Sequence, residues 1–417
     1  MGVIGANKTT HASISHAPSE GAAVVRIPAI EGLRAWLAWA VVFYHLSNAT
    51  NVDAHFNLIE RADAIGSGAV MIFMMVSGFV ITGLLLTRQE TWIPFITRRA
   101  FRLFPAYWIA LGLGVVAMLI RPDVFANVSW VSDPAFVADL AYHSANNQAV
   151  FDAPVEQALY HIALLQGLPP PAYMPHSATT ILGPAWSLTV EWQFYLVAPF
   201  LVWMARTQAR AMILVLAAAL MLFGMNRGWQ GDAVSITALP NFLYLFVIGI
   251  FSRIALPYTP KHAGFGWAAA VALVAIGTQT GIAPSIAIWL AFVVLIARVP
   301  GLTAPEARRG LLDSAFKAAF ESPLATYLGD RSYSVYILHS PLLVFVGYVI
   351  YPLHDFTRIE ALLAMLVVVV PTILIASDLM YRFVERPMIR AGARIANRLA
   401  AASVGRSGVT PSAAPAV

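Results

Sequence analysis

Apolar runs dominate the sequence from about residue 28 to residue 382, and each is long enough to approach or cross a hydrocarbon layer roughly 30 Å thick. Helices satisfy their own backbone hydrogen bonds in lipid, whereas the strands of a membrane barrel would alternate polar and apolar residues. The sequence therefore predicts an all-α, polytopic membrane helix bundle of about ten transmembrane helices. The expected spans are 28–49, 66–87, 101–120, 184–204, 210–225, 236–254, 264–279, 281–298, 332–352 and 360–382.

The composition agrees with a surface that faces lipid. Hydrophobic residues make up 59% of the 417 residues and charged residues only 11%, against roughly 45–50% and about 25% in an ordinary soluble domain. So few charged side chains cannot cover the exterior of a soluble protein of this length. The chain has no cysteine, which excludes disulfides, thiol nucleophiles and Cys-ligated zinc or iron–sulfur sites.

Basic and acidic residues alternate between successive inter-span segments. Arginine and lysine follow the second, fourth, sixth, eighth and tenth runs, whereas the intervening segments carry mainly aspartate and glutamate. Loops rich in Arg and Lys stay in the cytoplasm, so both termini are expected to be cytoplasmic. The formal net charge of +5 then arises from the basic residues of the loops that are expected to be cytoplasmic. No nucleic-acid partner is expected, because the basic residues are spread over loops that flank the membrane.

The same runs set the expected domain boundaries. Residues 1–26 are expected to form a flexible cytoplasmic tail, residues 27–390 the transmembrane domain, and residues 391–417 a basic, disordered cytoplasmic tail. One extracytoplasmic segment, about residues 121–183, is long and rich in proline near its end. Long loops usually carry function, so this segment is a candidate wall of an outward-facing site.

Arg34 and His45 in the first run are eleven residues apart. At about 100° per residue this is three turns plus roughly 20°, which places both on one helix face, about 16 Å apart along the axis. Ionisable groups within a membrane are costly and usually functional, and an imidazole is suited to moving a proton near neutral pH. The structural alternative, with Arg34 reaching the lipid headgroups and His45 bonded to a neighbouring helix, fits either residue equally well.

Arg98, Arg99 and Arg102 lie at the cytoplasmic entrance of the third run. Arg98 and Arg102 are four residues apart and share a helix face, so they would present two guanidinium groups in a geometry suited to phosphates. Spacing alone nevertheless favours ordinary anchoring at the membrane interface.

Two further polar groups of residues lie in the fourth and ninth runs. Ser187, Glu191 and Tyr195 follow one another at four-residue steps. Glu191 is thus a candidate acid–base or hydroxyl-binding group, although a hydrogen-bond clamp between helices explains the pattern equally well. Tyr336 and His339 are three residues apart, and for His339 a packing role is the favoured interpretation.

The order of these elements is similar to that of a known family. The matching segments are EGLR at 31–34 with YH at 44–45, FMMVSGFVI at 73–81, RRAFRLFPAYW at 98–108, WSLTVEWQFY at 186–195, SYSVYILHSP at 332–341 and ERP at 385–387. Over about residues 27–390 the chain resembles the acyltransferase-3 family, integral membrane acyltransferases that modify hydroxyl groups of envelope glycans and some secreted metabolites. The sequence departs from the family pattern at two places. Glu31 stands where Asp is more usual, and Met74–Met75 replaces a bulkier aromatic and aliphatic pair. Neither change removes a reactive group.

The resemblance implies a membrane enzyme that transfers acyl groups other than amino-acyl groups. Its donor would be cytoplasmic acyl-CoA, commonly acetyl-CoA, and its acceptor a carbohydrate or glycolipid at the bacterial inner membrane. Arg34 and His45 match the family's essential pair. The basic motif linked with the CoA side matches Arg98, Arg99 and Arg102.

In the expected mechanism the pantetheine arm runs along the Arg34 face and brings the thioester to His45. His45 acts as general base on the acceptor hydroxyl, with an acyl-histidine intermediate as the variant. Glu191 orients the imidazole or the sugar. The candidates for stabilising the oxyanion are Arg34, Ser77 and Tyr195, and the other supporting or acceptor-binding candidates are Ser187, Tyr336 and His339. No permanently bound cofactor and no metal are expected, because the ten histidines show no ligand spacing.

A transporter is the alternative from another functional class. Arg34, His45 and Glu191 would then form a proton or substrate relay within the membrane. The absence of a visible inverted repeat in the sequence and the arginine cluster at one cytoplasmic entrance weigh against this alternative.

Overall fold

The computed structural model describes residues 27–56, 59–88, 90–229, 231, 235–256, 282–298 and 311–407. Every regular element within these ranges is a helix, so the predicted all-α fold is confirmed. The α-helices are α1 Pro28–Ala49, α2 Val52–His55, α3 Ile59–Arg88, α4 Trp92–Ala126, α5 Pro134–Asp152, α6 Pro154–Ile162, α7 Trp186–Met204, α8 Gln208–Asn226, α9 Leu243–Ala255, α11 Ala283–Arg298, α12 Leu311–Phe320, α13 Pro323–Asp330, α14 Ser332–Ile350, α15 Arg358–Met380 and α16 Arg386–Ser407.

Five helical stretches in the described part of the chain are long and apolar enough to cross a membrane. They are Glu60–Arg88, Trp92–Ala126, Gln208–Asn226, Ser332–Leu353 and Arg358–Ala402. The helices α9 and α11 are apolar but shorter, and the expected span 264–279 lies outside the described residues. The protein is therefore a membrane-spanning helix bundle, while the count of about ten spans and the cytoplasmic placement of both termini stay predictions.

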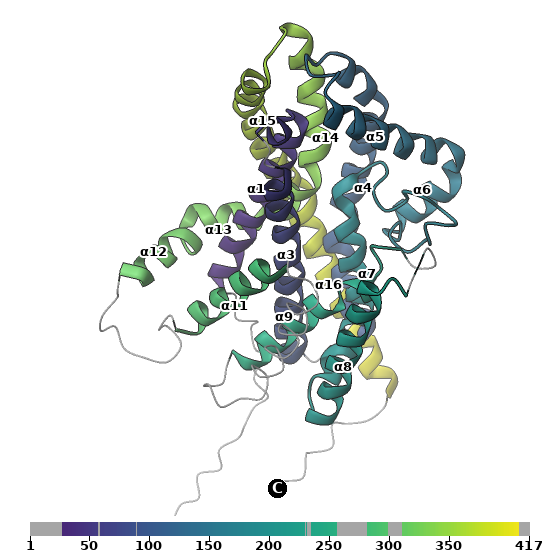
Figure 1. Ribbon diagram of the computed structural model, residues 1–417. Helices are drawn as coiled ribbons and strands as arrows, with labels where there is room; N and C mark the ends of the chain where they lie inside the picture. Colours follow the sequence, from purple (N-terminus) through teal and green to yellow (C-terminus); the bar gives the residue numbers. More distant parts are fainter. Residues whose placement is uncertain are drawn as a thin grey trace, which may run out of the picture.

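Helix α1 lies in the middle of the bundle, beside α3 and α14 (Figure 1). Pro28 begins it, at a position where the missing backbone N–H has no partner to lose. A Cβ atom on Gly32 would overlap the backbone carbonyl of Phe320 at the end of α12, so glycine allows the two backbones to touch there. This contact fixes the first turns of α1, which carry Arg34.

Helices α3 and α9 also approach each other through glycines. A Cβ atom on Gly78 would overlap the carbonyl oxygen of Phe246, and one on Gly249 would overlap that of Met75. Small residues permit such close packing between membrane helices, where dispersion contacts replace the hydrophobic effect. Ser77 and Phe246, next to these contacts, are thereby held close together on the two helices.

Helices α5 and α6 cover one end of the bundle, where the sequence suggests a long loop (Figure 1). Helix α4 first continues to Ala126, and Asp133 then caps α5 by accepting a hydrogen bond from the backbone N–H of Ala135. Arg358 at the start of α15 pairs with Asp133 at 2.6 Å. Two hydrogen bonds tie α6 to α4, from the Tyr107 hydroxyl to the His161 carbonyl and from the Trp108 indole to the Ile162 carbonyl.

The chain passes from α15 to α16 through one π-helical turn, Tyr381–Glu385. The side chain of Glu385 is only 2% exposed and accepts a hydrogen bond from Ser334 on α14. Helix α16 packs along α4 and runs to Ser407, so the segment expected as a tail from residue 391 begins as a helix. Residues 1–26, expected as the other tail, lie outside the described residues.

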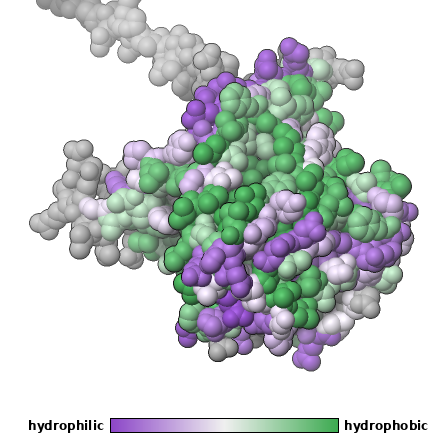
Figure 2. Space-filling model, turned by 90° about the horizontal axis from the view of Figure 1, so that it is seen from above, coloured by the Kyte–Doolittle hydropathy of each residue, from purple (hydrophilic) through white to green (hydrophobic). Residues whose placement is uncertain are grey.

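Apolar side chains are widespread on the surface, as a lipid-facing protein requires. Seen from the end that carries α5, hydrophobic residues alternate with hydrophilic patches (Figure 2). Examples of large exposed apolar side chains on the spans are Leu119 at 56%, Leu216 at 61% and Val367 at 73%.

Candidate active site

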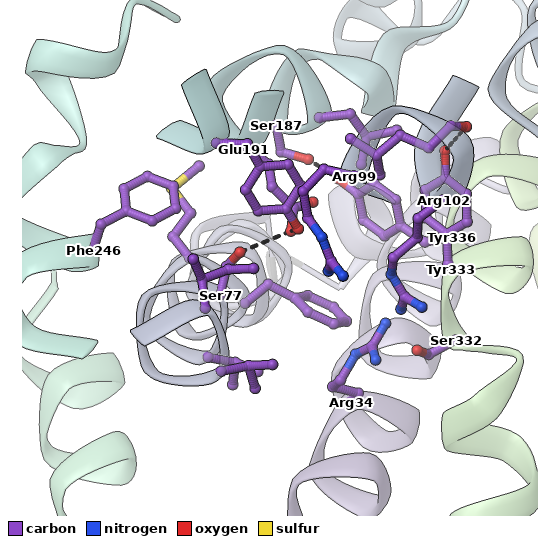
Figure 3. Close-up of a pocket in the computed structure, with 18 of the residues that line it drawn as sticks. Arg34, Ser77, Arg99, Arg102, Ser187, Glu191, Phe246, Ser332, Tyr333 and Tyr336 are labelled. Carbon is purple, nitrogen blue, oxygen red and sulfur yellow. Dashed lines mark hydrogen bonds between the residues drawn. The ribbon is translucent and has the colours of Figure 1, made fainter. Parts of the chain in front are cut away.

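A cavity of about 260 Å³ lies among α1, α3, α4, α7, α9 and α14 (Figure 3). On α3 its lining extends from Val70 to Leu84, which is about 21 Å of helix axis at 1.5 Å per residue. The cavity is therefore long and narrow. Its polar lining residues are Glu31, Arg34, Ser77, Arg99, Arg102, Ser187, Glu191, Tyr195, Ser332, Tyr333 and Tyr336.

Three arginines form one side of this cavity. The guanidinium groups of Arg34 from α1 and of Arg99 and Arg102 from α4 point into the same space (Figure 3). Arg34 pairs with Glu31 at 3.2 Å. The Nε atom of Arg99 is buried and has no hydrogen-bond partner in the described structure. Guanidinium groups present planar sets of N–H donors that match phosphates and carboxylates, so this side is built to hold an anionic or carbonyl oxygen.

A carboxylate on α7 forms the opposite side. Glu191 Oε1 accepts a hydrogen bond from Ser77 Oγ at 2.8 Å and another from the Tyr195 hydroxyl (Figure 3). Each of these hydroxyl groups has a single proton, which is already donated to Glu191. The guanidinium groups and the unpartnered hydroxyl of Ser332, rather than Ser77 or Tyr195, are thus the donors left in the cavity for a developing oxyanion.

Tyr336 lines the cavity on the side of His339. Its hydroxyl lies 2.7 Å from Ser187 Oγ and 3.0 Å from the Pro184 carbonyl oxygen. Its ring also meets the ring of Phe73 edge-on, with 5.9 Å between centroids. Two polar contacts and one aromatic contact therefore hold this side chain in place in the cavity lining.

Beyond Tyr336 lie two histidines. The rings of His45 on α1 and His339 on α14 are 5.1 Å apart between centroids, and His339 is 5.9 Å from the ring of Tyr336. Neither histidine is part of the cavity lining that the structure describes. Helix α1 is continuous between Arg34 and His45, and Tyr336, which lines the cavity and whose ring contacts that of His339, connects the cavity lining to the two histidines.

Comparisons with known proteins agree with the residue pattern. A family model described as an acyltransferase domain, that of the acyltransferase-3 family, matches residues 27–381. The chain belongs to the acyltransferase-3 family. This membership favours the acyltransferase over the transporter alternative.

Two curated relatives share this similarity. Peptidoglycan O-acetyltransferase OatA from Listeria monocytogenes is 26% identical over 415 residues, which cover 88% of this chain and 56% of the relative. Nodulation protein 10 from Rhizobium leguminosarum is 28% identical over 230 residues, covering 53% of this chain and 58% of the relative. The matches thus span little more than half the length of each relative. No solved structure matches the chain.

Of the basic residues that the acyltransferase-3 resemblance points to, the cavity gathers Arg34, Arg99 and Arg102 but not Arg98. Arg98 Nε lies 2.9 Å from Glu90 Oε2, and its Nη2 lies 2.7 Å from Asn397 Oδ1 on α16. Because α16 packs along α4, Arg98 is used to join these two helices. The shared face inferred from its spacing with Arg102 therefore does not lead to a shared site.

The cavity also contains groups for which the sequence suggested no role. Glu31, Ser332 and Tyr333 line it, and Tyr333 donates to the Leu103 carbonyl of α4 at 2.7 Å. Buried Glu385 acts electrostatically on Arg102. The signal that could have found it is an acidic residue directly after an apolar run, inside the ERP segment.

A third imidazole lies on α5, in the segment expected as a loop. His143 Nδ1 is 2.8 Å from Arg121 Nη1, and its Nε2 is 3.6 Å from Asp139 Oδ2. Burial and the nearby Arg121 lower the pKa of His143 to about 3. Because the guanidinium can only donate, Nδ1 is the acceptor and the ring proton of His143 lies on Nε2, toward Asp139.

Proposed function

We propose that this protein moves an acetyl group from cytoplasmic acetyl-CoA to a hydroxyl group of a cell-envelope glycan, within the inner membrane of a bacterium. The observation that carries the proposal is the cavity that gathers Arg34, Arg99 and Arg102 opposite Glu191. Family membership supplies the reaction class, and the peptidoglycan O-acetyltransferase of Listeria supports a glycan acceptor.

The shape and charge of the cavity suit the donor. A long, narrow space accepts a flexible chain such as the pantetheine arm of CoA, and converging guanidinium groups bind phosphate or carbonyl oxygens. The unpartnered Nε of Arg99 is a buried donor that a bound oxygen atom would satisfy. We therefore place the donor along α3, with its acyl end toward Tyr336.

His45 is proposed as the general base. The hydroxyl of the acceptor gives its proton to His45 as its oxygen attacks the acyl carbonyl. The C–O bond forms, the C–S bond breaks, and the CoA thiolate then takes the proton from His45. Arg34 and Arg99 are among the available donors for the oxyanion. This route requires Tyr336 to leave its contacts with Ser187 and Pro184, so that the thioester and His45 meet.

The test is acetyl transfer by the purified protein in lipid nanodiscs. Labelled acetyl-CoA is supplied with glycan prepared from a strain that lacks the protein, and esterified acetyl groups are counted by mass spectrometry. We expect saturable binding of acetyl-CoA and label on glycan hydroxyls. Binding without transfer to any glycan fraction would refute the acceptor class, and absence of binding would refute the donor.

Arg102→Ala and Arg210→Ala form a matched pair for this test. Arg102 lines the cavity, whereas Arg210 is half-buried on α8, outside the cavity lining, with its guanidinium 4.1 Å from the centroid of the Trp203 ring. Loss of one charge-assisted contact is worth about 1.5–3 kcal/mol, so Arg102→Ala should weaken acetyl-CoA binding roughly tenfold or more. Arg210→Ala should bind as the unaltered protein does.

A further inference from the structure

His339 has an unusual environment for a buried histidine. Its side chain is 0% exposed, and its Nδ1 atom lies 2.6 Å from the backbone carbonyl oxygen of Tyr336. A carbonyl oxygen can only accept, so Nδ1 carries the ring proton and Nε2 is left as an acceptor. That Nε2 atom is buried and has no hydrogen-bond partner in the described part of the chain.

His161 shows what a buried histidine with a structural role looks like in the same molecule. It is 1% exposed, with Nδ1 2.8 Å from the Gln157 carbonyl and Nε2 3.2 Å from the Thr180 hydroxyl. Both of its ring nitrogens are satisfied, as is usual for buried polar groups. His339 differs in keeping one fixed acceptor without a partner.

Of the two aromatic rings that contact the ring of His339, that of His45 has the nearer centroid. The two imidazole planes are inclined by 32°, with 5.1 Å between centroids. The other imidazole that interacts electrostatically with His45 is His143, but its Nδ1 is occupied by Arg121 and its Nε2 faces Asp139. Tyr44, whose ring adjoins that of His45, donates its hydroxyl proton to Asp63 at 2.8 Å. His339 is therefore the neighbour whose lone pair is available.

We propose that His339 is the positioning residue of His45, and this rests on the proposed role of His45 as general base. In the reactive arrangement, a small rotation of the neighbouring rings lets Nε2 of His339, unpartnered in this structure, accept the N–H of His45, which leaves the other ring nitrogen of His45 unprotonated and directed at the acceptor hydroxyl. The Tyr336 carbonyl fixes His339, and His339 fixes His45, in the way that an oriented third group supports a catalytic base. Tyr336 also lines the cavity, so a movement of its ring on donor binding would align the pair.

The proton balance is simple. The acceptor hydroxyl transfers its proton to the free nitrogen of His45, and the resulting imidazolium keeps its second N–H bonded to His339. The new C–O bond forms, the C–S bond breaks, and the thiolate of CoA recovers the proton from His45. His339 gains and loses no proton over the cycle.

Three variants at position 339 separate this role from packing. His339→Gln places an amide oxygen near the position of Nε2, His339→Asn places it near Nδ1, and His339→Leu removes the acceptor. Partners that orient a metal-bound histidine are typically worth about 10–100-fold in activity, and we expect an effect of the same order for a histidine that acts as a base. We expect kcat to fall by about that factor in His339→Leu and His339→Asn, with substantial recovery in His339→Gln, and the KM for acetyl-CoA to stay unchanged.

The outcomes are decisive in either direction. Transfer is measured with labelled acetyl-CoA and unacetylated envelope glycan, with His161→Leu as the control for loss of a buried histidine. If His339→Leu retains the full kcat, or if Asn supports kcat as well as Gln does, the proposal is overturned. Should His339→Leu not accumulate, the comparison of Gln with Asn decides alone.

His45→Ala keeps the two proposals apart. If that variant remains fully active, the assignment of His45 as general base is wrong. If it is inactive while His339→Leu is unimpaired, only the pairing of the two histidines fails.

Discussion

The cavity and the histidine pair are neighbouring polar regions with opposite chemistry. In the cavity, Arg34 is paired with Glu31 and the carboxylate of Glu191 accepts two hydroxyl protons. In the pair, no acidic residue among those described bonds to either His45 or His339, and one ring nitrogen has no partner. Fixed charges suit holding an anionic ligand, whereas an imidazole with a free acceptor suits moving a proton. In the proposed mechanism, Tyr336 separates donor binding from proton transfer.

The largest expected effect is on the histidine side. His45→Ala should lower the transfer rate by about 10²–10⁴, the usual contribution of a general base, while leaving the dissociation constant for acetyl-CoA unchanged. The measurement is single-turnover acetyl transfer beside equilibrium binding. Equal loss of binding and transfer would show that the two regions are one site rather than two.

A substitution of Glu191 tests the cavity side of this comparison. Glu191→Gln removes the charge that holds Ser77 and Tyr195, and hydrogen bonds to a charged group are each worth about 1.5–3 kcal/mol. We expect activity to fall at least about tenfold, with a lower melting temperature in detergent. Ser77→Ala should have a smaller effect, because the Tyr195 hydroxyl still bonds to Glu191. Equal losses in the two variants would contradict this arrangement.

Replacing Arg98 tests whether its side chain lies outside the acetyl-CoA site. Arg98→Ala breaks contacts with Glu90 and Asn397, so it should destabilise the packing of α16 on α4 by about 1–2 kcal/mol. The acetyl-CoA dissociation constant of the folded protein should be unchanged, unlike that of Arg102→Ala. Thermal unfolding and binding isotherms on both variants make the check, and a comparable loss of affinity in Arg98→Ala would place it in the donor site.

Tyr336→Phe should have a modest effect at the boundary between the two regions. Without its hydroxyl, the ring loses its contacts with Ser187 and the Pro184 carbonyl and opens more readily. We expect acetyl-CoA hydrolysis without glycan to rise a few-fold, consistent with loss of about 0.5–1.5 kcal/mol of hydrogen bonding. An unchanged or lower hydrolysis rate would show that Tyr336 does not act as a barrier.

The smallest expected effect concerns His143 and pH. Its pKa is lowered to about 3 by burial and then by Arg121, whereas an unfolded chain protonates its histidines near pH 6.5. The stability contribution is therefore complete above about pH 6.5 and is lost as the pH falls toward 3. Between pH 7 and pH 5, the free energy of unfolding should fall by about 1–2 kcal/mol more in the wild-type protein than in His143→Gln. If the melting temperatures of the two proteins change equally with pH over this range, the buried position of His143 is contradicted.

The sequence anticipated much of the framework. The first run, 28–49, coincides with α1, and eight of the other runs contain the cores of α3, α4, α7, α8, α9, α11, α14 and α15, because long apolar segments leave few alternatives in lipid. Most polar residues singled out in the runs meet in the cavity. Residues such as Arg34, Ser77 and Glu191 converge because a polar group in a lipid-exposed helix must face the interior.

The sequence could not show which side chains from different helices contact one another, because this depends on how the helices pack. Periodicity places Arg98 and Arg102 on one face, but only the position of α16 decides that Arg98 bonds to Asn397. The apolar runs did not reveal α5, whose 19 residues are only partly apolar, or α6, which has nine residues. The contact of Tyr336 with Ser187 joins residues 149 positions apart, which spacing within one helix cannot reveal.

One paired measurement tests the central claim most directly. Arg102→Ala and His45→Ala are compared for acetyl-CoA affinity and for the rate of transfer from bound donor. The separation of binding and proton transfer by Tyr336 predicts weakened binding in Arg102→Ala, and intact binding with transfer almost abolished in His45→Ala. Intact binding in Arg102→Ala together with full transfer in His45→Ala would contradict it.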